Sequence, residues 1–83
     1  MKQLTVLSRS YCHLCDDMIA ALQDLQSRFD FAFAVVEIDQ RPELEANWGD
    51  KVPVLLDGEV EICHFFLDQD RLARHLAATH RHA

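Results

Sequence analysis

Cys12-His13-Leu14-Cys15 forms a C-x-x-C pair between a short apolar run, Leu4–Leu7, and a long amphipathic segment that begins at Asp16. The thiolate is the reactive form of cysteine, and a helix N-terminus stabilises it through unpaired N–H groups and the positive end of the helix dipole. A cysteine three residues further along lies one helical turn away, within reach of a disulfide bond. In a chain with a β-α-β pattern, this spacing favours a redox-active pair.

Length and composition predict one globular domain over residues 1–83, with a frayed tail at 78–83. The chain has 83 residues, of which 49% are hydrophobic and 27% charged, and its formal net charge is -6. An acidic chain lacks the clustered Lys and Arg that phosphate binding needs, which argues against nucleic acid as a partner. We find no signal-peptide pattern and no apolar run near the ~20 residues of a membrane span. We therefore expect a cytoplasmic monomer without membrane contact.

The first half of the chain predicts a strand, a helix and a second strand. Leu4–Leu7 is apolar on both alternating faces apart from Thr5, as in a central strand buried between two layers. Ser10 is the predicted N-cap of the following helix. The apolar stripe of that helix consists of Met18, Leu22, Leu25 and Phe29. Phe31–Asp39 predicts a second buried strand, parallel to the first because the crossover is right-handed.

The second half predicts a short helix, a hairpin and a closing helix. The short helix covers Gln40–Trp48. Two strands, Val52–Leu56 and Val60–Cys63, flank Asp57-Gly58, a dipeptide favoured in two-residue hairpin turns, so we expect them to be antiparallel. Asp68 is the predicted cap of the closing helix. The fold class is therefore α/β, a four-stranded mixed sheet flanked by three helices.

The element order, the C-x-x-C pair at the first helix and the Val52-Pro53 pair before the third strand resemble the thioredoxin superfamily. Within it, the chain is most similar to a small bacterial glutaredoxin-like family. The resemblance implies a thioredoxin fold and a thiol–disulfide oxidoreductase with no bound cofactor or metal. It makes Cys12 the nucleophile and Cys15 the resolving cysteine. It also makes Pro53 a cis-proline beside the cysteines, which leaves the backbone of Val52 free to pair with an extended substrate.

Arg9 and His13 are the other substrate-binding candidates. Arg9 stands where glutaredoxins have a basic residue that holds the thiolate and a carboxylate of glutathione, and His13 is placed to stabilise the thiolate. Three glutathione-binding features of the family are altered, at His13-Leu14, Lys51 and Phe65-Phe66. The resemblance thus implies glutathione as a reductant, with incomplete binding motifs. The implied partner is a disulfide-containing protein or a small thiol substrate.

Two other functions stay open at this point. A thioredoxin-fold module without turnover could hold an extended partner along Val52-Pro53 by main-chain pairing. A carrier could bind a metal ion or an iron–sulfur cluster through Cys12 and Cys15. A structural zinc site normally needs four ligands, and the chain has a single C-x-x-C pair.

The remaining conspicuous residues are predicted to be structural. Strand alternation places Val60 and Ile62 on one face of the last strand and Cys63 on the other. Cys63 is therefore expected to be a semi-buried structural cysteine. Three aromatic residues, Trp48, Phe65 and Phe66, are assigned to the core, and the alternative for them is the rim of the substrate groove.

Overall fold

Residues 2–79, which the computed structural model describes, form a four-stranded mixed sheet and three helices. In chain order the elements are β1 (Lys2–Ser8), α1 (His13–Leu25), β2 (Phe31–Glu37), α2 (Pro42–Trp48), β3 (Val54–Asp57), β4 (Val60–His64) and α3 (Gln69–Thr79). The strand order is β2-β1-β3-β4, in which β1 and β2 are parallel and the other neighbours are antiparallel. The predicted α/β class and element order are confirmed.

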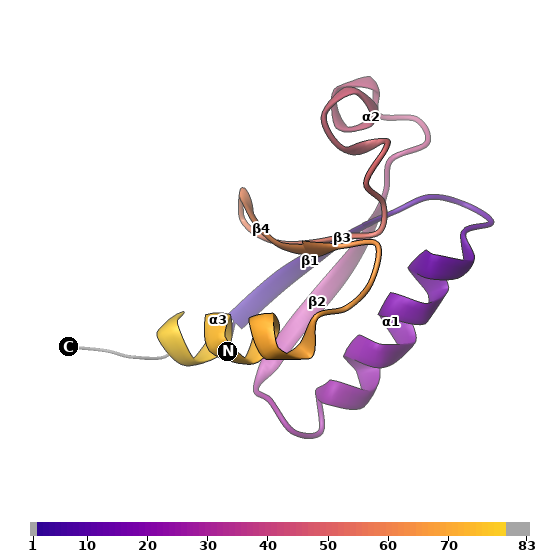
Figure 1. Ribbon diagram of the computed structural model, residues 1–83. Helices are drawn as coiled ribbons and strands as arrows, with labels where there is room; N and C mark the ends of the chain where they lie inside the picture. The colour runs from indigo at the N-terminus through magenta and orange to yellow at the C-terminus, as the bar shows by residue number, and fades with distance from the viewer. Residues whose placement is uncertain (1, 80–83) are drawn as a thin grey trace.

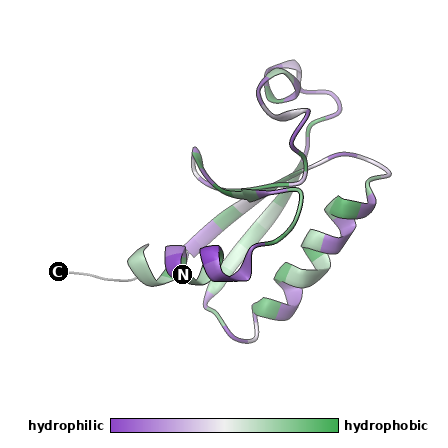
Figure 2. Ribbon diagram, viewed as in Figure 1, coloured by the Kyte–Doolittle hydropathy of each residue, from purple (hydrophilic) through white to green (hydrophobic). Residues whose placement is uncertain are grey.

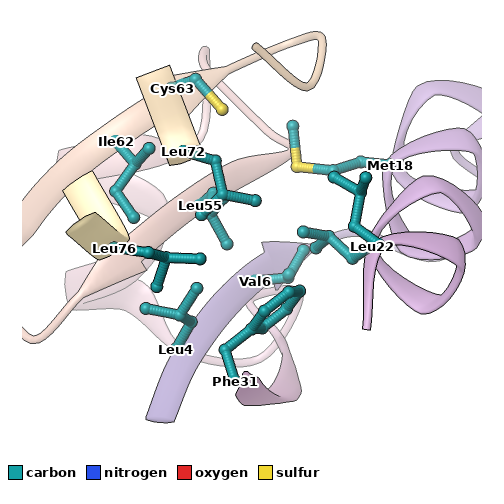
Figure 3. Packing of buried hydrophobic residues seen from close by; sticks show 11 residues of the cluster. Leu4, Val6, Met18, Leu22, Phe31, Leu55, Ile62, Cys63, Leu72 and Leu76 are labelled. Atoms are coloured by element: carbon teal, nitrogen blue, oxygen red, sulfur yellow. The ribbon is translucent and has the colours of Figure 1, made fainter. Parts of the chain in front are cut away.

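The helices cover both faces of the sheet, with α1 and α3 on one side and α2 on the other (Figure 1). Figure 2 shows β3 and β4 as largely hydrophobic, as expected of strands covered by helices. The larger core lies beneath α1 and α3 (Figure 3) and contains Leu4, Val6, Met18, Leu22, Leu25, Phe31, Leu55, Ile62, Cys63, Leu72 and Leu76. The smaller core lies on the side of α2 and contains Leu7, Ile38, Val54 and Leu56.

β1 is central, as predicted, because β2 and β3 pair along its two sides. Leu4 and Val6 belong to the larger core and Leu7 to the smaller one, so β1 is buried on both faces. β2 was expected to be buried as well, but it lies at the edge of the sheet and Val35 is 43% exposed. The prediction was wrong because an apolar run does not reveal which strand has a second neighbour.

The hairpin between β3 and β4 turns one residue later than predicted. Asp57 pairs with Val60, so the turn residues are Gly58 and Glu59. Gly58 has a φ of +61°, and Glu59 is not among the residues with positive φ. A glycine with positive φ at the first turn position is typical of a type II′ turn, which a residue with a Cβ would adopt only with strain.

A bulge in β4 changes which side chains reach the core. Leu55 pairs with Cys63 and Leu56 with Glu61, so Ile62 is the extra residue on the bulged strand. Ile62 and Cys63 are both buried in the larger core, and Figure 3 shows the Cys63 sulfur directed toward Met18. The predicted strict alternation was wrong because one added residue breaks a period of two.

α3 begins as predicted but extends further than expected. Asp68 caps it, since its Oδ1 accepts the N–H of Arg71 at 3.0 Å. The helix includes Ala78 and Thr79, which the prediction assigned to a frayed tail, while the rest of that tail lies outside the described residues. Between residues 2 and 79, no helix combines the length and the apolar character needed to cross a membrane.

Asp57 joins three elements at the end of the sheet where β1 begins. His75 Nε2, on α3, lies 2.7 Å from Asp57 Oδ2, and Lys2 Nζ, on β1, lies 3.0 Å from the same oxygen. The hydrogen bond with His75, and then Lys2, lowers the pKa of the Asp57 carboxyl. The stability that ionised Asp57 contributes is therefore complete above its unfolded pKa of about 3.9 and is lost as the pH falls through the lower folded value.

Truncating Leu55 tests the larger core. Leu55 is fully buried, so Leu55→Ala leaves a cavity, and we expect the free energy of unfolding to fall by about 2–5 kcal/mol. Val60→Ala, on the neighbouring strand but 57% exposed, is the control, with an expected loss below about 1 kcal/mol. Urea unfolding followed by circular dichroism measures both losses. Equal losses would contradict the assigned core.

Replacing Asp57 by Asn tests the link between α3 and the hairpin. At about pH 7 we expect Asp57→Asn to lower the free energy of unfolding by roughly 1–2 kcal/mol, because the variant loses a charged hydrogen-bond acceptor. The difference from the unmodified protein should shrink as the pH falls below about 4. Glu59→Gln, exposed in the adjacent turn, is the control. A difference that stays constant from about pH 7 to pH 3 would contradict the assigned role of ionised Asp57.

Candidate active site

Four connecting segments meet at one end of the sheet. β1 and β2 run parallel and both finish there, and Val54 at the start of β3 pairs with Leu7 on one side and His64 on the other. The segments 9–12, 38–41, 51–53 and 65–68 therefore share this end, which we call the Cys12 end. Figure 1 shows the loop from β1 to α1 at this end of the sheet.

Cys12 is the N-cap of α1. Its backbone is extended, with φ -116° and ψ 110°, and its Sγ accepts the N–H of Cys15 at 3.2 Å. The prediction that Ser10 caps this helix was wrong. The chain turns at Tyr11, whose φ is 57°, and the Ser10 N–H instead donates to Asp39 Oδ2 at 3.0 Å. A half-exposed sulfur thus stands where a helix normally receives a capping oxygen.

Cys15 lies on the first turn of α1 and is fully buried. Burial raises the pKa of the Cys15 thiol, and its hydrogen bond with the Cys12 side chain raises the pKa further. Hydrogen bonds from the Arg9 backbone and the Ser8 side chain oppose this effect in part. The structure therefore brings together one accessible sulfur and one protected sulfur, both in the free thiol form.

Arg9 lies in a cluster of charged side chains with the carboxylates of Glu45 and Asp39. Its Nη1 and Nη2 each donate to a Glu45 oxygen at 2.8 Å, and Asp39 Oδ1 lies 3.6 Å from Nη1. The bond to Glu45 raises the pKa of Arg9, and the same bond lowers the pKa of the Glu45 carboxyl. Hydrogen bonds from Ser10, and then the Arg9 charge, lower the pKa of Asp39. Arg9 therefore ties the loop before Cys12 to α2.

Gly49 completes this cluster. Its carbonyl accepts a hydrogen bond from Arg9 Nη2 at 3.1 Å. A Cβ at this position would lie 2.5 Å from the Glu45 carbonyl oxygen, 2.8 Å from Glu45 Oε1 and 3.3 Å from Arg9 Nη2. Because the backbone of α2 approaches so closely here, only glycine fits without displacing the ion pair.

The other predicted site residues also lie at the Cys12 end. His13 is exposed at the first position of α1. Val52 is half-buried, Pro53 is buried, and the peptide bond between them is cis. Pro53 directly precedes the β3 residue that pairs with Leu7, so it neighbours the end of β1, from which the Cys12 loop departs.

Three exposed aromatic residues surround this end of the sheet. Tyr11 is fully exposed, Phe65 is 38% exposed and Phe66 is 68% exposed. The prediction that Phe65 and Phe66 belong to the core was wrong, because they occupy the connection between β4 and α3 rather than a buried face. Trp48 packs against the smaller core, as predicted.

Sequence reasoning missed several residues of the site, above all Glu45, Asp39 and Ser8. Glu45 is 36 positions from Arg9, and no local pattern connects them. Tyr11 offered a signal, because it directly precedes Cys12 of the C-x-x-C motif. Across residues 2–79, no group of three or more His, Cys, Asp or Glu side chains is arranged to hold a metal ion.

Comparisons with known proteins cover nearly the whole chain. A family model described as a glutaredoxin-like domain matches residues 3–77. An uncharacterized protein of Mycobacterium tuberculosis is 32% identical over 81 residues, or 90% of this chain and 82% of that protein. A solution structure from Nitrosomonas europaea shares 40% identity with a TM-score of 0.82, covering 90% of this chain and 91% of that one. Thioredoxin 1 of Thermosipho africanus, 22% identical, has a TM-score of 0.62 over 95% and 99% of the two chains, which confirms the predicted thioredoxin fold.

Alkylation of the native protein tests the different exposure of the three cysteines. Cys15 and Cys63 are buried, and burial raises the pKa of each thiol. We therefore expect iodoacetamide at about neutral pH to modify Cys12 at least about tenfold faster than either of them. Mass spectrometry of proteolytic peptides over time locates the adduct.

The control for this experiment is Cys12→Ser, which should remove the fast phase and leave only slow modification. Labelling of Cys15 or Cys63 at the rate of Cys12 would contradict the assigned exposure.

Proposed function

This chain belongs to the glutaredoxin-like domain family of the thioredoxin superfamily, and we propose that it is a thiol–disulfide oxidoreductase acting through Cys12 and Cys15. One observation carries the proposal. Cys12 places a half-exposed sulfur at the N-terminus of α1, where it accepts the Cys15 N–H at 3.2 Å, and the Cys15 side chain follows one turn later in a buried position. Family membership alone would not carry it, since a fold does not determine a function.

The first step is attack by Cys12 on a substrate disulfide. The Cys12 thiol loses its proton, and the thiolate attacks one sulfur of the disulfide. A mixed disulfide forms between Cys12 and that sulfur, and the other substrate sulfur leaves as a thiolate that takes up a proton. N–H groups of the first turn of α1 and the helix dipole stabilise negative charge on the Cys12 sulfur.

The second step is resolution by Cys15. Its thiol loses a proton, and the resulting thiolate attacks Cys12 Sγ, so that the second substrate sulfur leaves and a Cys12–Cys15 disulfide remains. Two electrons have then passed from the protein to the substrate. A thiol reductant restores the two cysteines, and glutathione is the reductant that the family resemblance implies. Burial raises the pKa of the Cys15 thiol, which favours its protonated form before the substrate binds.

Substrate binding is proposed for His13, Val52 and Pro53, whereas Arg9, although predicted to bind substrate, is engaged by Glu45 and Gly49. In the described part of the chain no hydrogen bond engages the backbone of Val52, which supports main-chain pairing with an extended substrate. His13 lies next to the reactive sulfur in the sequence. We infer that the protein acts as a monomeric single domain in the cytoplasm, where glutathione and thioredoxin systems keep thiols reduced. The proposed substrate is a disulfide-containing protein or a small disulfide.

Two cysteine variants separate the proposed steps. We expect Cys12→Ser to reduce turnover of a disulfide substrate at least about a thousandfold, because no nucleophile remains at the exposed position. Cys15→Ser should accumulate the mixed disulfide with Cys12, since the resolving sulfur is gone. Intact-mass spectrometry detects the trapped adduct, and a thiol-release assay measures turnover.

Cys63→Ser is the matched control, because Cys63 is buried in the larger core on β4 and has no partner cysteine. It should keep turnover within about twofold. Turnover that survives in Cys12→Ser would contradict the catalytic assignment. A folded protein that binds a peptide yet never turns over a disulfide would instead favour a binding module.

A further inference from the structure

We propose that the Cys12 end takes disulfides of uncharged or cationic polypeptides rich in apolar side chains, and that Glu45 is a specificity residue that disfavours glutathione. The inference rests on the proposed redox function and names the substrate class of the same site. Three observations carry it: the engagement of Arg9, the surplus of carboxylates at this end, and the exposed aromatic residues.

Arg9 is already occupied by carboxylates of its own chain. Glu45 accepts a hydrogen bond from each of Nη1 and Nη2 at 2.8 Å, the Gly49 carbonyl accepts a further one from Nη2, and Asp39 lies 3.6 Å from Nη1. A bidentate arginine–carboxylate pair fixes the guanidinium in one orientation. An incoming carboxylate must therefore displace a partner that is tethered nearby, and the charge of Arg9 is neutralised before any ligand arrives.

Carboxylates outnumber basic side chains at the Cys12 end. We consider the segments 9–17, 37–51 and 64–71, which include the connecting segments and the adjoining helix turns. Their acidic residues are Asp16, Asp17, Glu37, Asp39, Glu43, Glu45, Asp50, Asp68 and Asp70. Their basic residues are Arg9, Arg41, Lys51 and Arg71. An electrostatic field of this sign attracts cations and repels anions as they approach the site.

Glutathione is an anion that this field disfavours. At neutral pH each glutathione unit carries two carboxylates and one ammonium group, so oxidised glutathione has a net negative charge. The three other basic residues of these segments, Arg41, Lys51 and Arg71, are outnumbered by the nine carboxylates, and Lys51, next to Val52, lies over the Trp48 ring at 5.7 Å. Basic peptide segments carry the opposite charge, so the same carboxylates attract them.

Exposed aromatic side chains supply the apolar part of the surface. All three exposed aromatic residues among residues 2–79 lie here: Tyr11 precedes Cys12, and Phe65 and Phe66 follow β4. The Phe65 N–H donates to the Pro53 carbonyl at 2.8 Å, which fixes this pair beside the cis-proline. Phe65 also packs edge-on against His64, with 4.7 Å between the ring centroids. The concentration of exposed rings at one end indicates a contact surface.

The backbone at two of these aromatic residues is unusual. Tyr11 and Phe65 have φ values of 57° and 66°, and they are the only non-glycine residues with positive φ in the described chain. Bulky residues rarely adopt this conformation, and it is concentrated at functional sites. Both residues flank the segment that would contact a substrate.

A hollow beside Phe66 has the mixed character that a basic, apolar peptide requires. Its volume is about 490 Å³, and its lining combines Phe66 and Leu67 with two carboxylates, Asp68 and Asp70, and one cation, Arg71. An aliphatic stem can pack on the apolar residues while its charged end meets the carboxylates, as lysine and arginine side chains do at other surfaces.

The test compares the rates at which four disulfides oxidise the reduced 83-residue protein. Hydroxyethyl disulfide, which is neutral and small, reports the reactivity of Cys12 and Cys15 without regard to charge. Oxidised glutathione supplies the anion. Two peptide disulfides carry phenylalanine beside the cysteine and differ only in having lysines or glutamates as the remaining charged residues. Second-order rate constants come from acid quenching and mass spectrometry, at low and at high ionic strength.

We expect the lysine peptide to react at least about tenfold faster than the glutamate peptide at low salt, with a smaller ratio at high salt because charges are screened.

Glu45→Gln should raise the ratio of the glutathione rate to the hydroxyethyl rate about two- to fivefold, since it frees the Arg9 charge. Glu43→Gln removes the same charge from the same helix without touching Arg9, and should leave this ratio within about 1.5-fold.

Phe66→Ser should lower the ratio of the lysine-peptide rate to the hydroxyethyl rate about three- to tenfold. Val60→Ser, likewise exposed but at the other end of β4, should leave that ratio unchanged.

The outcomes distinguish the two levels of the proposal. If hydroxyethyl disulfide fails to oxidise the protein, the redox function itself falls, and the substrate class with it. If it reacts but oxidised glutathione reacts as fast as the lysine peptide, the redox function stands and the inferred substrate class is overturned. Equal responses to Glu45→Gln and Glu43→Gln would overturn the role of Glu45.

Discussion

The burial of β1 on both faces is the constraint on which the rest of the structure depends. Its side chains enter the core beneath α1 and α3 and the core beneath α2, so its backbone groups must be paired along both edges. The pairing with β3 sets Leu7 opposite Val54. That register places Pro53 beside the end of β1 and therefore beside the loop that leads to Cys12. Core packing thus positions the segments of the Cys12 end.

The two ends of the sheet use similar polar contacts for different purposes. Where β1 begins, Asp57 joins the hairpin, α3 and the first strand through His75 and Lys2, and each partner side chain is less than one-third exposed. At the Cys12 end, Arg9 joins the loop to α2 through more exposed contacts with Glu45 and Asp39. Exposed ion pairs contribute little to stability. At the Cys12 end these contacts matter because they set the net charge beside Cys12, where Glu45 and Asp39 neutralise the positive charge of Arg9.

The sulfur of Cys12 links the structural and chemical roles of α1. As the N-cap it accepts an N–H that would otherwise lack a partner, and the same N–H stabilises a negative charge on sulfur. Cys15 is held in the core by the helix that Cys12 begins. Cys63 shows the contrast, because it is buried in the larger core on β4, and burial raises the pKa of its thiol while a hydrogen bond from the Asp68 backbone opposes this effect in part. Exposure, more than the presence of a thiol, distinguishes Cys12 from Cys63.

The amino-acid sequence by itself determined the order of elements, the helical stripe of Met18, Leu22 and Leu25, and the cysteine pair, because each depends on neighbours within a few residues. It located the hairpin to within one residue, since a glycine that tolerates positive φ marks the turn. Only the tertiary structure decided that β2 lies at the edge, that Ile62 bulges, that Phe65 and Phe66 are exposed, and that Glu45 meets Arg9. These features depend on which strands adjoin and on contacts between distant residues, and periodic patterns of 2.0 or 3.6 residues carry no information about such pairings.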